Sequence, residues 1–70
     1  REIEFVYKDR ECAITNHTNR WWFHDGVDQV DVCEFRNFEV LVNKVAEYMV
    51  EDKTIQEIFD AGLYRNLSIL

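Results

Sequence analysis

Two adjacent tryptophans, Trp21 and Trp22, lie within the largely aromatic segment 20–24. If this segment is a β-strand, successive side chains point to opposite faces of the sheet. One tryptophan can then pack in a hydrophobic core. The other lies on the opposite face, where only a second layer or a partner molecule can cover it. The pair therefore predicts a sheet with a large aromatic side chain on each face.

The length of the chain, 70 residues, corresponds to one small domain. A domain of this size buries only about 60% of the surface of its unfolded chain, so large side chains must supply the core. Five Phe, three Tyr and two Trp can do so, because each buried aromatic removes roughly 150–250 Å² from water. We therefore expect a single domain over residues 1–70, without a deep enzymatic cleft.

Alternation of apolar and polar residues predicts a first strand over residues 2–8. A two-residue turn at Asp9-Arg10 would then place Lys8 opposite Glu11 and begin a second, antiparallel strand. The opposite charges of this cross-strand pair favour that register.

The polar residues 16–19 are expected to form a four-residue loop before the third strand. A loop of even length keeps Trp21 and Phe23 on the core face and places Trp22 on the outer face, opposite Ala13.

A further hairpin signal, Asp25-Gly26, follows the third strand. A loop of either two or four residues there brings Val30 and Val32 to the same face as Trp21 and Phe23. Two independent turns thus assign Trp21 to the core.

Apolar residues in the second half of the chain recur at helical spacing. Asn37 is the expected N-cap of a long helix that reaches Met49. Thr54 and Glu57 have the spacing of a capping box, which predicts the start of a short second helix. Gly62 lies where a left-handed residue would end that helix.

Together these elements predict an α+β domain in which a three- to four-stranded antiparallel meander precedes one long and one short helix, both packed on one sheet face. Segment 63–70 is either a further strand or a packed tail. The expected core face carries Ile3, Phe5, Tyr7, Ile14, Trp21, Phe23, Val30 and Val32; the long helix faces it with Phe38, Leu41, Val42, Val45 and Met49, and the short helix with Ile55, Ile58 and Phe59.

The net charge of −6 opposes binding to nucleic acid, because most non-specific affinity for the phosphate backbone comes from basic side chains. We therefore expect no duplex nucleic acid as a partner. The acidity serves either solubility or contact with a basic partner. Since no signal-peptide pattern and no apolar run of about 18 residues occur, we expect a cytoplasmic protein that has no membrane partner.

The only cysteines and histidines are Cys12, His17, His24 and Cys33. Their spacing matches no compact zinc motif, and the expected registers send Cys12 to the core and Cys33 to the outer face. We therefore expect two free thiols, no metal and no cofactor. Cys33 with His24 is the only candidate pair of nucleophile and base. No glycine-rich loop accompanies it, so we expect no catalytic residue and no enzymatic activity.

Segments 5–11 and 53–60, together with Trp22-Phe23, give the chain a layout that resembles small proteins of low-GC Gram-positive bacteria and their phages, most of them uncharacterised. The resemblance implies the fold and a cytoplasmic setting. It implies no catalytic or binding residue.

Five residues are candidates for a protein contact on the outer face: Trp22, Val6, Ala13, Arg20 and His24. A tryptophan beside an arginine is typical of binding hot spots. We therefore expect a non-enzymatic protein-interaction or regulatory module, with a protein partner or a second copy bound through this face or an edge strand. Two alternatives remain. Trp22 could be covered by a helix and be structural, or it could stack on a ligand or on single-stranded nucleic acid.

Overall fold

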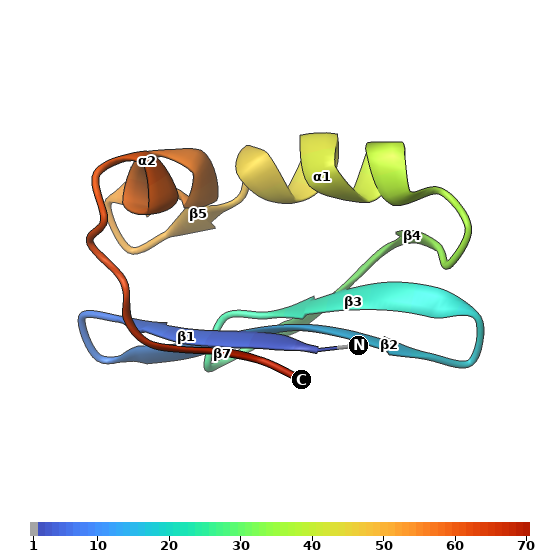
Figure 1. The fold of residues 1–70 in the computed structure, drawn as a ribbon, viewed down its shortest axis with the longest axis horizontal. Coiled ribbons are helices and arrows are strands. Elements are labelled where there is room, and N and C mark those ends of the chain that lie inside the picture. Colours follow the sequence, from blue (N-terminus) through green and yellow to red (C-terminus); the bar gives the residue numbers. More distant parts are fainter. Residues whose placement is uncertain (1) are drawn as a thin grey trace.

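The computed structural model describes residues 2–70. Five strands form one antiparallel sheet in the order β4-β3-β2-β1-β7, and both helices lie on the same face of it (Figure 1). This confirms an α+β fold with one strand more than expected. The elements are β1 (Ile3–Tyr7), β2 (Arg10–His17), β3 (Arg20–His24), β4 (Gln29–Glu34), α1 (Phe38–Ala46), β5 (Met49–Val50), β6 (Lys53–Thr54), α2 (Ile55–Asp60) and β7 (Arg65–Ile69).

The β1–β2 hairpin turns at Lys8-Asp9 rather than at Asp9-Arg10. Tyr7 pairs with Arg10, and Lys8 adopts the left-handed conformation with φ 54°. The expected pairing of Lys8 with Glu11 is therefore wrong. Since side chains alternate with a period of two, a register change of two residues leaves every side chain on its expected face.

The β2–β3 turn is also shorter than expected. Thr18 and Asn19, at φ 51° and 60°, form a two-residue turn of the kind whose twist suits a hairpin. Trp22 consequently lies opposite Thr15 instead of Ala13. This change is again two residues, so Trp22 stays on the outer face.

A β-bulge interrupts the pairing of β3 with β4. Trp22 pairs with Asp31 and Trp21 with Cys33, which leaves Val32 as the extra residue. Because a bulge breaks the alternation of faces, Val32 and Cys33 are both buried. The expected position of Cys33 on the outer face is therefore wrong.

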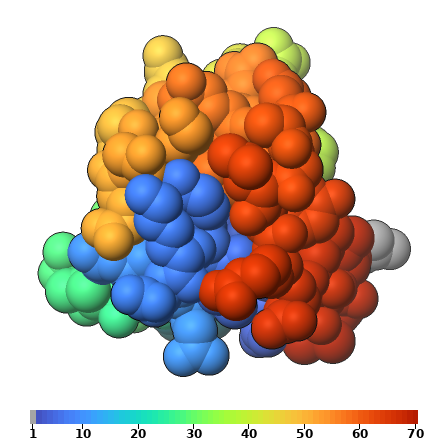
Figure 2. Space-filling view, turned by 90° about the vertical axis from the view of Figure 1, so that its left-hand side faces the viewer, coloured from blue at the N-terminus to red at the C-terminus, as the bar shows by residue number. Residues whose placement is uncertain are grey.

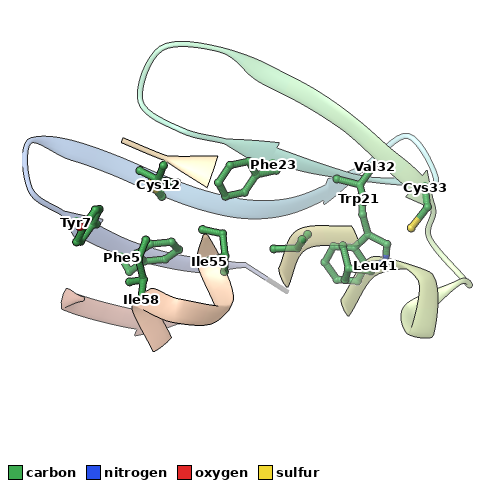
Figure 3. Close-up of a cluster of buried hydrophobic side chains, with 12 residues drawn as sticks. Phe5, Tyr7, Cys12, Trp21, Phe23, Val32, Cys33, Leu41, Ile55 and Ile58 are labelled. Carbon is green, nitrogen blue, oxygen red and sulfur yellow. The ribbon is translucent and has the colours of Figure 1, made fainter. Parts of the chain in front are cut away.

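Twelve buried side chains form one continuous core between the sheet and the helices. Trp21 and Cys33 lie near Leu41 of α1, whereas Phe5 lies near Ile58 of α2 (Figure 3). Trp21 also fixes the approach to α1, because its Nε1 donates to the carbonyl of Phe35 at 2.9 Å.

Several residues expected in the core are exposed. Val30 lies on the correct face of the sheet but on its edge strand, and it is 39% exposed; Met49 is 56% exposed. Helix α1 ends at Ala46, three residues before the expected end. Two contacts oppose its continuation, since Tyr48 packs against Phe23 with ring centroids 5.3 Å apart and its carbonyl accepts from Ile55 N.

The capping signals of α2 are confirmed. Thr54 Oγ1 accepts from the backbone N–H of Glu57, and the Glu57 carboxylate accepts from the backbone N–H of Thr54. At the other end Gly62 has φ 64°, and the N–H of Leu63 donates to the carbonyl of Ile58. The N–H of Gly62 donates to the carbonyl of Phe59, and the two bonds together form a Schellman motif. In contrast, Asn37 occupies the N-cap position of α1 without a side-chain capping bond.

Two turns are joined at one end of the molecule. Tyr7 Oη donates to Asp52 Oδ1 at 2.8 Å, and Lys8 Nζ lies 3.0 Å from the same oxygen. Arg10 and Glu51 form a second ion pair. Figure 2 shows the blue β1–β2 turn against the yellow-orange β5–β6 segment. These bonds therefore hold the β1–β2 turn of the sheet against the β5–β6 turn, which lies between the two helices.

Segment 63–70 is confirmed as structured, because β7 pairs with β1 and forms an edge of the sheet. Within residues 2–70, neither helix has the length and apolar character needed to cross a membrane.

The capping box predicts a measurable loss of stability. Thr54→Ala should lower the free energy of unfolding by about 1 kcal/mol, since it removes the acceptor for a helix N–H. Gln56→Ala, in the same helix, should change it by less than about 0.5 kcal/mol. Urea unfolding followed by circular dichroism measures both values. Equal losses in the two variants would contradict a role for the cap.

The ion pair at the joined turns predicts a specific pH dependence. Hydrogen bonds from Lys8 and Tyr7 lower the pKa of Asp52 from its ordinary value of 3.8 to about 2. The stabilisation is therefore complete above pH 3.8 and is lost as the pH falls through about 2. Asp52→Asn should be less stable than wild type at neutral pH, and this difference should shrink over that acid range. Asp28→Asn is the control, and a pH-independent difference for Asp52→Asn would contradict the assignment.

Candidate functional site

The five outer-face candidates all lie on the expected face and are partly buried. The two register changes separate them, however. Val6 pairs with Glu11, Ala13 lies beside His24, and Trp22 lies beside Thr15. The candidates thus run diagonally across the sheet instead of forming the expected row of neighbours.

Trp22 already has partners within the chain. Its ring stacks on His17, with centroids 4.9 Å apart and planes 4° from parallel. Its Nε1 donates to the carbonyl of His17 at 3.2 Å. One face of the indole is therefore covered by an adjacent strand, which reduces the surface that a partner or a nucleic-acid base could use.

Neither α1 nor α2 covers this outer face, since both lie on the opposite side of the sheet (Figure 1). The positive charge next to Trp22 is paired, because Arg20 Nε donates to both carboxylate oxygens of Asp31, at 2.7 and 2.9 Å. His24 Nε2 lies 3.2 Å from Thr15 Oγ1. The face is thus accessible, but many of its polar groups already bond to one another.

Both cysteines are free and buried in the core, in different regions of it (Figure 3). Burial raises the pKa of the Cys12 thiol to about 11, and the nearby Asp25 carboxylate adds to this shift. Cys33 Sγ lies 3.6 Å from the carbonyl oxygen of Asn37. The expected opposite facing of the two thiols is wrong.

The sheet lies between the cysteines and the stacked His17. Among residues 2–70, no group of three or more Cys, His, Asp or Glu side chains could hold a metal ion. The arrangement therefore gives no support to a zinc site built from the four residues that the sequence singled out.

An apolar groove with a volume of about 770 Å³ lies between the sheet and the helices. Its floor includes Ile3, Ile14 and Ile69, which belong to three adjacent strands: Ile3 pairs with Ile14 on one side and with Ile69 on the other. These three side chains form one aliphatic row across the sheet.

The wall of the groove is the apolar stripe of α1. Leu41 and Val45 in this stripe are buried, whereas Phe38 and Val42 are 62% and 50% exposed. The sequence predicts this stripe correctly, but the expected place of Phe38 and Val42 in the core is wrong. All four residues line the groove, but half of the stripe is exposed, because the helices leave part of the sheet uncovered.

The rim of the groove is polar and acidic. Asn43, Gln56 and Asp60 are its polar lining residues, and among residues 2–70 Asp60 is the only charged residue of the lining. The groove therefore combines an aliphatic floor with a negative edge. It contains no pair of groups suited to acid–base or nucleophilic chemistry.

No protein-family model, curated protein or solved structure matches this chain. The resemblance to small proteins of Gram-positive bacteria and their phages consequently stays a prediction, and the site is argued from its geometry alone.

The outer-face candidates predict a contact separate from the groove, which Trp22→Ala should abolish. If Trp22 joins two copies or binds a partner, the variant should show a lower mass in solution or lose its captured partner. It should also lose roughly 1–2 kcal/mol of stability, less than a fully buried tryptophan would cost. Sizing with light scattering and affinity capture measure the first effect. An unchanged mass and partner would show that Trp22 is structural, and salt-sensitive quenching by an oligonucleotide would support the stacking alternative.

Proposed function

We propose that this chain is a non-enzymatic protein-interaction module that binds a protein partner through the apolar groove. The observation that carries the proposal is the exposed half of the α1 stripe above the aliphatic row of the sheet. Apolar side chains at helical spacing normally pack against another element. In this chain, Phe38 and Val42 stay 62% and 50% exposed, although the ring of Phe38 meets that of Trp21 edge-on at 6.4 Å.

A protein segment fits the groove better than a small ligand does. Sites for small molecules enclose most of the ligand surface and carry several convergent polar groups. The lining of this groove includes residues as exposed as Phe38 in α1 and Ile69 in the edge strand β7, at 62% and 63%. Such an open apolar surface is typical of a protein contact.

A cytoplasmic setting belongs to the proposal. The free thiols of Cys12 and Cys33 are consistent with a reducing compartment. Their burial also suits structural rather than reactive thiols, because the reactive species is the exposed thiolate.

Selection from a library of displayed random peptides tests the proposal. Peptides enriched on the wild-type protein should lose at least about tenfold in affinity for Val42→Asp, which places a charge in the groove wall. Val40→Asp is the matched control, since Val40 belongs to the same helix and is 39% exposed but does not line the groove. Both variants are first checked for an unchanged circular dichroism spectrum. Enriched peptides that tolerate Val42→Asp as well as Val40→Asp would overturn the groove as the binding site.

A further inference from the structure

We infer that the groove receives an amphipathic helix of a protein partner, with an apolar face toward the sheet and a basic polar face. The inference rests on the proposed function and adds the chemistry of the partner that the same site would bind. Three observations support it: the width of the floor, the incomplete helical layer and the charge of the rim.

The floor has the width of one helix. Ile69, Ile3 and Ile14 lie on three adjacent strands, and two strand spacings of about 4.8 Å give a width of about 10 Å. An α-helix with its side chains is about 10–12 Å across. A partner helix laid on this row would contact Val42 and Phe38 on one side. It would extend the layer that α1 and α2 begin.

The rim favours a basic partner. Asp60 lines the groove, and no Lys or Arg of residues 2–70 does so. Glu39 lies on the same side of α1 as Asn43 and Ala46, which follow it by four and seven residues and line the groove. The polar face of a bound helix would therefore lie near two carboxylates, and no basic residue of the described part of the chain lines the groove.

A second copy of this chain is a poorer occupant. Each copy carries a net charge of −6, so two copies repel one another. Lys8, Arg10 and Arg20 are already held in ion pairs with Asp52, Glu51 and Asp31. Addition of a strand at the β7 edge is opposed by the bulge in that strand, where Asn66 has φ 54°.

A pair of synthetic peptides tests the inference. Both are about 16 residues long, about 24 Å as a helix, and carry leucines at positions i, i+3, i+4 and i+7. One has lysines at the remaining positions and the other has glutamates. Fluorescence anisotropy should show the lysine peptide binding at least about tenfold more tightly, with weaker binding as salt rises from about 0.05 to about 0.5 M. Circular dichroism should show that this peptide gains helix on binding.

Two charge-matched double variants locate the effect. Glu39→Gln combined with Asp60→Asn should reduce the preference for lysine at least about threefold. Glu11→Gln combined with Asp28→Asn changes the net charge equally but away from the groove, and should leave the preference nearly unchanged. Val42→Asp should abolish binding, whereas Trp22→Ala should not.

The outcomes separate this inference from the proposed function. Equal binding of both peptides, lost in Val42→Asp, would overturn the basic partner and keep the groove as a protein site. Failure of both peptides to bind, while displayed peptides still depend on Val42, would overturn the helical occupant. A dimer in solution that Val42→Asp dissociates would assign the groove to a second copy and overturn the inference.

Discussion

The core depends on the period-two alternation of the strands, which sends Phe5, Cys12, Trp21 and Phe23 to one face of the sheet. In both N-terminal hairpins, the cross-strand pairing is shifted by two residues from the expected register. Neither change moves a side chain to the other face, because only an odd change can do so. The core therefore stays the same when a turn shifts the pairing by two residues, but it would change if the alternation of faces were broken. Where an odd change does occur, at the bulge between β3 and β4, it adds Cys33 to the core.

The small area of the helical layer determines which part of the sheet stays uncovered. Helices of nine and six residues lie on a five-stranded sheet. Trp21, Leu41 and Val45 are covered, and so is the cluster of Phe5 with Phe59, whose rings meet edge to face at 5.0 Å. What stays open is the aliphatic row and half of the α1 stripe. The groove thus exists because two short helices cannot cover the whole face of a five-stranded sheet.

Charge is distributed unevenly around this framework. Near the β1–β2 turn, basic and acidic side chains pair with one another and join two hairpins. At the groove, Asp60 has apolar and amide neighbours in the lining and no basic residue among the described ones. The acidic side chains of this chain therefore also act locally, since Asp60 gives the apolar groove a negatively charged edge.

The sequence by itself determined the features that depend on local physics. These are the face of each residue in the first three strands, the capping box at Thr54, the left-handed Gly62 and the apolar stripe of α1. Only the tertiary structure decided features that depend on distant contacts. The bulge, the end of α1 at Ala46 and the pairing of β7 with β1 each rest on partners far along the chain. The candidate site was decided by the tertiary structure, because the sequence pattern of an apolar stripe is the same whether or not another layer covers it.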